Sequence, residues 1–104
     1  MSRPRYWWYD YVRKSVIDSL KRIKVGKDPV TLQETLAQTA VKRVLFELET
    51  ENRGSERIAF IQLLYGKRAS NLPGIAMQMY ISEGTARDWS RDFIYRVAMY
   101  MGFL

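Results

Sequence analysis

The chain has 104 residues, of which 47% are hydrophobic, and its 17 Lys and Arg against 11 Asp and Glu give a formal net charge of +6. This length fits one domain with a single hydrophobic core. Because Cys and His are absent, disulfides, zinc sites with thiolate or imidazole ligands, Ser-His-Asp triads and cysteine nucleophiles are excluded, so we expect a protein that is not an enzyme and has no cofactor or metal.

The N-terminal segment is predicted to form one amphipathic helix from Tyr6 to about Lys24, with Gly26 marking its end. The residues expected on its buried side are Trp8, Val12, Val16, Leu20 and Ile23. Five aromatic residues occupy all sides of its start, which predicts either stacking on single-stranded nucleic acid or a buried helix start with a dimer contact. We favour the dimer contact for this cluster of Tyr6, Trp7, Trp8, Tyr9 and Tyr11.

A second helix is expected to begin near residue 30 and to run to about Thr50. Two signals compete for its start: Asp28 followed by Pro29, and a capping box of Thr31 with Glu34. Its buried stripe is predicted to consist of Leu36, Ala37, Ala40, Val44 and Leu48.

Three more helices are predicted in the C-terminal half. Ser55 is expected to cap a helix that ends at Gly66, and Ser70 or Asn71 to cap a short helix with Pro73 in its first turn. A last helix should run from about residue 83 to 101. The predicted buried residues are Ile58, Ile61, Leu64 and Tyr65 in the first of the three helices, and Ala86, Trp89, Phe93, Val97 and Met101 in the last.

The apolar spacing is helical in every segment, so the sequence predicts an all-α fold of about five helices. Residues 1–104 are expected to form a single domain, with residues 1–52 as a supporting or oligomerising helical part and residues 53–104 as the part that carries the motif described next. No apolar run approaches the ~18 residues that a membrane helix requires, and the N-terminus leads into aromatic residues rather than a secretory core. We therefore expect an intracellular, cytoplasmic protein.

Residues 75–91 have the pattern of a helix-turn-helix unit. Ala76 is small where two crossing helices come closest, residues 80–82 form the turn, and Ser82 is a good N-cap for the second helix. The apolar contacts between the two helices are assigned to Ile75, Met79, Ile81, Ala86 and Trp89.

Tyr80 occupies the turn position that commonly carries glycine. A tyrosine would be strained there in a left-handed conformation, so we expect a turn opened by one residue or shaped differently.

This pattern predicts major-groove binding to double-stranded DNA through short polar residues at a helix start and two arginines one turn apart. The outward residues of the second helix are Glu83, Gly84, Thr85, Arg87, Asp88 and Arg91; the other candidate DNA contacts are Ser82, the preceding loop residues Lys67, Arg68 and Asn71, and a minor-groove arm of Arg3 and Arg5. Each of these residues could also have a role that involves no DNA. Arg87 and Arg91 can pair with neighbouring carboxylates, Ser82 can serve as a cap only, and the loop and terminus can be merely solvated.

The basic residues are unevenly distributed along the chain. Residues 3–24 carry seven basic residues against two acidic ones, residues 53–104 carry seven against four, and residues 29–52 carry two against four. Basic segments at both ends of the chain, with a more acidic segment between them, favour a nucleic acid as the partner. The carboxylates Asp10, Asp18, Glu34 and Glu47 show no spacing that would place two of them together in a cleft.

Residues 57–67, the short loop after them, the pair Ile75-Ala76 and the turn Ile81-Ser82 together resemble region 4 of sigma factors and the phage late-gene activators of the ArpU and RinA type. The resemblance spans residues 55–104, and residues 3–9 also look like the start of prophage-encoded members of that group. It implies a phage or prophage transcription regulator at the nucleoid of a bacterial host, with RNA polymerase as a candidate partner. The apolar tail, residues 93–104, departs from the sigma pattern, and we expect it to dock on another surface.

Two alternatives to a DNA-binding transcription regulator stay open. Small terminase subunits of phages also join a helix-turn-helix to oligomerising helices; they form rings, whereas a monomer or homodimer favours the regulator. A protein-interaction module acting on RNA polymerase would bind no bases at all.

Overall fold

The computed structural model describes residues 6–66 and 71–104, and these ranges contain five α-helices and no strand. The helices are α1 (Tyr9–Val25), α2 (Leu32–Glu49), α3 (Gly54–Gly66), α4 (Leu72–Gln78) and α5 (Glu83–Tyr100). The prediction of an all-α fold with about five helices is confirmed. None of the helices in the described ranges combines the length and the apolar content needed to cross a membrane.

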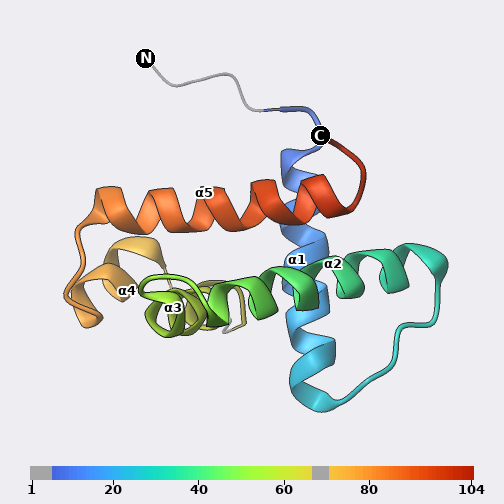
Figure 1. The fold of residues 1–104 in the computed structure, drawn as a ribbon, viewed down its shortest axis with the longest axis horizontal. Helices are drawn as coiled ribbons and strands as arrows, with labels where there is room; N and C mark the ends of the chain where they lie inside the picture. Colours follow the sequence, from blue (N-terminus) through green and yellow to red (C-terminus); the bar gives the residue numbers. More distant parts are fainter. Residues whose placement is uncertain (1–5, 67–70) are drawn as a thin grey trace.

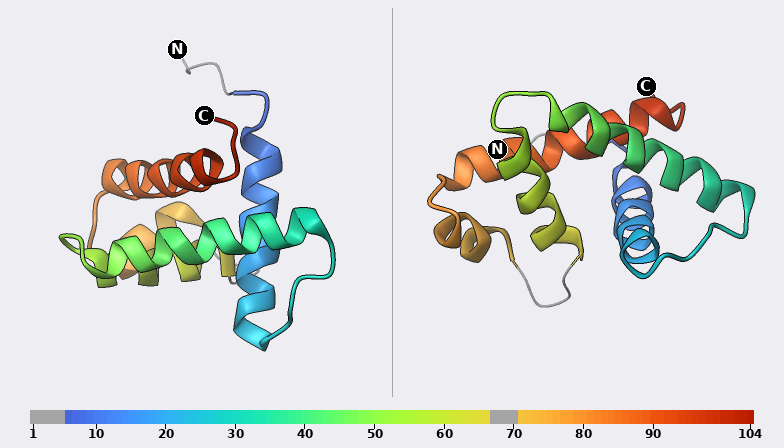
Figure 2. Two further views of the ribbon diagram at one scale, coloured as in Figure 1. Left: turned by 45° about the vertical axis from the view of Figure 1, so that its right-hand side comes forward. Right: turned by 60° about the horizontal axis from the view of Figure 1, so that its bottom comes forward.

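The two longest helices, α2 and α5, lie side by side and run in opposite directions, while α1 crosses behind both of them (Figure 1). Arg43 of α2 lies over the ring of Tyr100 at the C-terminal end of α5. Glu51, just after α2, pairs with Arg96, which comes before Tyr100 in α5, as an antiparallel arrangement requires. The shorter helices α3 and α4 pack against the N-terminal half of α5, and α3 also contacts α1 and α2 (Figure 2). α5 therefore contacts all four of the other helices.

Local sequence signals explain most of the helix boundaries. Gly26 ends α1 in a left-handed conformation with φ 71°, as predicted. The capping box of Thr31 and Glu34 starts α2, so Asp28 is not the cap. Two predicted starts were wrong: α1 begins at residue 9 rather than 6, and α3 begins at Gly54 rather than after a Ser55 cap.

Gly54 is buried where the start of α3 meets the end of α2. A methyl group at this position would come within 1.6 Å of the carbonyl oxygen of Leu48. The preceding residue, Arg53, has a left-handed φ of 58°, so the chain turns sharply here. Only glycine permits this close approach of the two backbones.

The core contains residues from all five helices, and its fully buried members include Phe60, Ile61 and Phe93. The predicted stripe of α2 is correct except for Leu36, which is 45% exposed although the next residue, Ala37, is buried. Some residues predicted to be buried are only half-buried, namely Ile23, Ile58, Leu64, Trp89 and Met101. The prediction missed several buried residues, namely Ser19, Gln38, Val41, Phe60, Ser90, Ile94 and Ala98.

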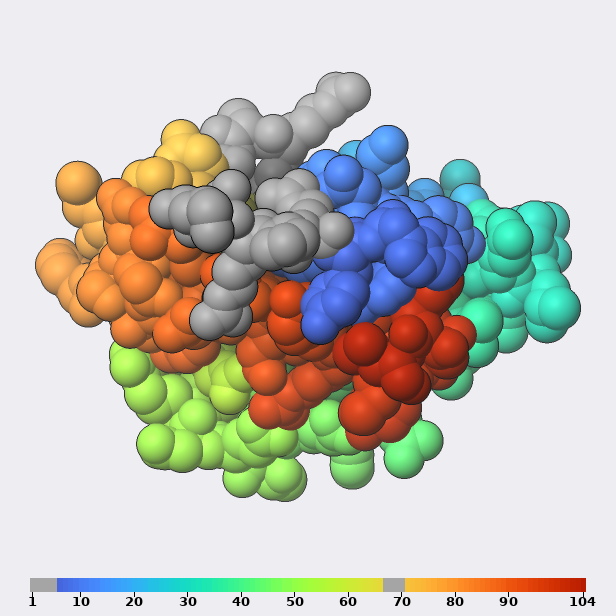
Figure 3. Space-filling model, turned by 90° about the horizontal axis from the view of Figure 1, so that it is seen from above, coloured from blue at the N-terminus to red at the C-terminus, as the bar shows by residue number. Residues whose placement is uncertain are grey.

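The aromatic start of the chain packs against the C-terminal end of the same chain. Trp8 is buried, and its ring lies 5.9 Å from Tyr95 and 6.0 Å from Phe103. Phe103 also contacts the rings of Trp7 and Tyr11. In Figure 3 the blue N-terminal residues and the dark red C-terminal residues adjoin as one surface. The apolar tail thus docks on α1 of its own chain, although Trp7 stays 83% exposed.

Candidate nucleic-acid interface

α4 and α5 form a tight pair joined by a short turn. Ile75 and Ala76 of α4 and Ala86 of α5 are buried between them. At the end of α4, the N–H of Ile81 donates to the carbonyl of Ala76 at 3.0 Å, and the N–H of Tyr80 donates to the carbonyl of Met77 at 3.3 Å. These two bonds close the helix in the manner of a Schellman motif.

The expectation of an opened or reshaped turn at Tyr80 was wrong. Tyr80 adopts the left-handed conformation itself, with φ 57°, and its side chain is 97% exposed. The turn therefore keeps the backbone shape that glycine would give, and the tyrosine bears the strain, which is roughly 1–2 kcal/mol for a residue with a Cβ. The apolar residues on either side, Met79 and Ile81, pack against the core and hold the turn in place.

Ser82 caps α5, which is the simpler of its two predicted roles. Its hydroxyl oxygen accepts from the N–H of Thr85 at 3.0 Å, and the hydroxyl group donates to the Thr85 hydroxyl oxygen at 2.9 Å. Thr85, which was predicted to face outward, is half-buried. The cap leaves other N–H groups of the first turn of α5 unpaired within the helix, so the positive end of the helix faces solvent.

The outward face of α5 begins with Glu83, Gly84, Arg87 and Asp88, all exposed. Arg87 pairs with Glu83 at 3.0 Å, with both side chains more than half exposed, so the pair is worth less than ~1 kcal/mol and can open for a ligand. Arg91 is half-buried and forms no ion pair with another residue of ranges 6–66 and 71–104. This face carries two acidic and two basic residues and is electrically balanced.

The remaining predicted DNA contacts are less well defined. Asn71 is exposed and caps α4, where its side chain accepts from the N–H of Gly74 at 2.8 Å. Arg3, Arg5, Lys67 and Arg68 lie outside the described residues, so they stay predictions. The segment that leads into α1 lies beside α5. The ring centroid of Tyr6 is 5.9 Å from that of Tyr95, which lies one helical turn after Arg91.

Trp89 serves the core, as predicted, although it is only half-buried. Its ring meets Phe60 edge to face at 5.8 Å, and the guanidinium of Arg53 covers it at 4.9 Å. Arg53 also pairs with Glu56, so this arginine is engaged on the α3 side and is not part of the outward face of α5.

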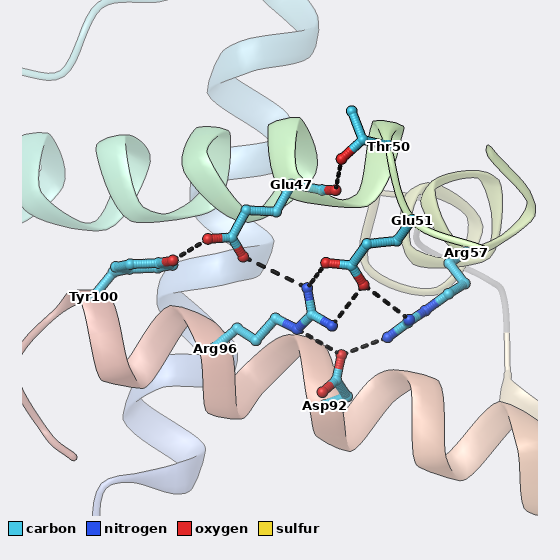
Figure 4. Close-up of polar contacts among 7 residues, drawn as sticks. All are labelled: Glu47, Thr50, Glu51, Arg57, Asp92, Arg96 and Tyr100. Atoms are coloured by element: carbon cyan, nitrogen blue, oxygen red, sulfur yellow. Dashed lines mark hydrogen bonds and ion pairs between the residues drawn. The ribbon is translucent and has the colours of Figure 1, made fainter. Parts of the chain in front are cut away.

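The C-terminal half of α5 is joined to α2 and α3 by a network of charged side chains (Figure 4). Arg96 donates two hydrogen bonds to Glu51, at 2.7 and 2.8 Å, and pairs with Asp92 at 2.9 Å and with Glu47 at 3.5 Å. Arg57 of α3 joins the same group by pairing with Asp92 and Glu51. We call these residues, with Tyr100, the α2–α5 network.

The electrostatics of the α2–α5 network follow from these contacts. The hydrogen bonds from Arg96 hold the pKa of Glu51 below the ordinary value of 4.5, and those bonds raise the pKa of Arg96. The hydroxyl of Tyr100 donates to Glu47, which raises the pKa of Tyr100. Three helices are thus fixed to one another by bidentate, charge-assisted bonds.

The sequence prediction missed this network, although a signal was present. Glu47 and Glu51 are four residues apart, as are Asp92 and Arg96, and both pairs flank a buried stripe. The network also weakens the argument from net charge, because Arg57 and Arg96 neutralise carboxylates of their own fold. Two of the seven basic residues of residues 53–104 are therefore unavailable to a phosphate backbone.

Carboxylate side chains gather around two arginines of the described residues. Asp18 and Glu34 converge on Arg22, and Glu47, Glu51 and Asp92 converge on Arg96. An arginine holds each group, so these carboxylates are ion-pair partners. The described part of the chain contains no group of His, Cys, Asp or Glu side chains arranged to hold a metal ion.

A largely apolar groove of about 500 Å³ lies away from α5, among α1, α2 and α3. It is lined by Leu20, Ile23, Lys24, Leu45, Ala59, Gln62, Leu63 and Gly66. The right-hand view of Figure 2 shows the three helices that frame it. No residue of α4 or α5 contributes to its walls.

Comparison of the chain with protein-family models, with characterised proteins and with solved structures finds no match.

Proposed function

We propose that this protein is a sequence-specific, double-stranded DNA-binding transcription regulator that reads the major groove with α5. The observation that carries the proposal is the pair α4–α5: a buried Ala76 at the crossing, a closed turn, and a capped helix start whose outward residues are short or polar. This is the arrangement in which the second helix of a helix-turn-helix enters the major groove. The sigma-region-4-like pattern of residues 55–104 supports the same function.

Within this proposal the outward residues have separate roles. Arg87 and Arg91 are one turn apart on α5, so one guanidinium can reach a guanine edge while the other holds a phosphate. The fold itself does not require glycine at Gly84, because a Cβ there would meet nothing closer than 3.9 Å. In this proposal the missing side chain lets the DNA backbone approach the helix start. Because the face is electrically balanced, affinity must also come from basic residues outside it, and the best placed by sequence are Lys67, Arg68, Arg3 and Arg5.

Selection of bound duplexes from a random pool tests this function directly. We expect enrichment of one motif, with at least one conserved G·C pair at the positions read by arginine. An Arg87→Ala variant should enrich a motif that has lost its preference at one base pair while it keeps the rest. A pool that stays random after repeated rounds would rule out sequence-specific binding.

One observation favours the interaction module as a second candidate function. The apolar groove among α1, α2 and α3 is a surface on which a protein partner such as RNA polymerase could dock without touching α5. A salt titration separates the two functions, because DNA binding through ~4–6 phosphates gives a log–log slope near −4 to −5, whereas docking in an apolar groove depends little on salt.

A further inference from the structure

One side of α1, together with Trp7 in the turn just before it, carries an exposed row of residues that no other helix covers. Positions 7, 11, 14, 18, 21 and 25 advance in alternating steps of four and three, the spacing of residues that meet a second helix along a seam. Trp7, Tyr11 and Val25 are 83%, 44% and 69% exposed, and the three charged members are exposed as well: Lys14, Asp18 and Lys21. We call these six residues the α1 ridge.

The α1 ridge faces away from the rest of the fold. Val12, Val16 and Leu20, on the opposite side of the helix, are the residues buried against the core. Within the chain, Tyr11 touches Phe103 and Asp18 pairs with Arg22, and both side chains keep a large part of their surface open. Figure 1 shows α1 crossing behind α2 and α5, and the exposed members of the α1 ridge lie on the side of α1 opposite its buried residues.

The order of residues along the α1 ridge is complementary to itself. Two copies of α1 packed antiparallel around a two-fold axis near position 16 bring Trp7 opposite Val25 and Lys14 opposite Asp18, each twice. The same register places Tyr11 opposite Lys21, an aromatic ring opposite a cation. A parallel pair would instead face each of Lys14, Asp18 and Lys21 with its own copy, and three like-charge contacts oppose that arrangement.

We propose that the protein forms a two-fold symmetric homodimer through antiparallel contact of the α1 ridges. Trp7 is the anchor of this interface, because a large aromatic side chain held in place by Phe103 loses little freedom on binding. The inference does not depend on the DNA-binding proposal, since no residue of the outward face of α5 takes part. If both hold, the dimer carries two copies of α5 related by a two-fold axis.

Sedimentation equilibrium over a range of protein concentrations tests the dimer. A single helix pair is a small interface, so we expect a dissociation constant of about 10–100 µM and a limiting mass of twice 12.3 kDa. Lys14→Glu, and separately Asp18→Lys, should each weaken association about tenfold or more, because each places like charges opposite one another twice. The double variant Lys14→Glu/Asp18→Lys should restore association to within about threefold of the original protein.

The controls distinguish a specific contact from a change in net charge or folding. Lys42→Glu changes the charge equally on an exposed residue of α2 and should leave association unchanged. Thermal unfolding by circular dichroism identifies any variant that has lost its fold. Lys14→Glu leaves the pair of Asp18 with Arg22 in place, so it keeps the test valid if Asp18→Lys is destabilised by its neighbour Arg22. A monomer at 1 mM, a dimer insensitive to Lys14→Glu, or a double variant no better than the single variants would overturn the proposal.

Discussion

The two halves of α5 differ in how they are held. Its C-terminal half is tied to α2 and α3 through Arg96 and Asp92, which make several short bonds each to neighbouring helices. Its N-terminal half presents Arg87 and Asp88 to solvent, and the ion pair of Arg87 with Glu83 lies within the same helix. We call the C-terminal half of α5 the fixed end and its N-terminal half the open end. The proposed role in reading DNA requires this combination, because the helix must be rigidly supported while its start stays accessible.

The junction that supports the fixed end should be the most sensitive point of the fold. Gly54→Ala should destabilise the protein by about 3 kcal/mol or more, because its Cβ would overlap the carbonyl oxygen of Leu48 at 1.6 Å and α2 and α3 would have to separate. Urea unfolding measures this loss. Gly84→Ala, at the open end and with free space around it, should instead raise stability by about 0.5–1 kcal/mol.

The next largest effect is expected in the α2–α5 network. Arg96→Met should cost about 1–3 kcal/mol, because Glu47, Glu51 and Asp92 would face one another without the arginine that holds them, although water reaches the site. Arg87→Met at the open end should change the free energy of unfolding by less than about 0.5 kcal/mol. Equal losses in the two variants would contradict the difference between the two halves.

Acid should weaken the fixed end through Glu51. Its pKa is lower in the folded protein than the ordinary 4.5, chiefly through the hydrogen bonds from Arg96, so the folded state takes up this proton less readily than the unfolded state. The stabilisation is therefore complete above about pH 4.5 and is lost as the pH falls through the folded-state value. Unfolding measured between pH 6 and 3 should show a smaller acid loss in Arg96→Met than in the original protein.

A residual loss is still expected in Arg96→Met, because Glu34 and Glu56 also have lowered pKa values, chiefly through hydrogen bonds from Thr31 and Arg53 respectively. Identical pH profiles for the two proteins would show that Arg96 does not control the titration of Glu51.

The smallest effect concerns the turn at the open end. Tyr80→Gly should stabilise the protein by about 0.5–1 kcal/mol, because glycine adopts φ 57° without strain and the lost side chain is 97% exposed. Met77→Gly, on an exposed position of α4 with ordinary helical geometry, should destabilise the protein by a similar amount. Thermal unfolding of both variants checks the opposite signs.

The sequence predicted the helices well because their signals are local. Apolar spacing, the capping box of Thr31 and Glu34, and Gly26 each depend on a few neighbouring residues, and the structure shows all three. The prediction failed where distant segments decide the outcome. Leu36 has the spacing of the predicted stripe of α2 but is 45% exposed, whereas Phe60 is buried because α5 brings Trp89 against it.

The candidate site was harder to predict than the fold. Whether Tyr80 would open the turn depended on whether packing of Met79 and Ile81 outweighs backbone strain, and sequence alone gives no measure of that balance. The basic residues were counted together, yet Arg57 and Arg96 are paired with carboxylates that lie 35 to 49 residues away in the sequence. A count of charges cannot reveal such long-range pairing.

The salt dependence of DNA affinity, measured by fluorescence anisotropy on a selected duplex, tests the role of α5 most directly. The original protein should show a slope near −4 to −5, and Arg87→Ala/Arg91→Ala should weaken binding at least about tenfold with a slope shallower by one to two. Lys24→Ala/Lys27→Ala removes the same charge from the far end of α1 and should bind almost as the original protein does. A flat salt profile, or equal binding by the Arg87→Ala/Arg91→Ala variant and its control, would contradict DNA reading by α5.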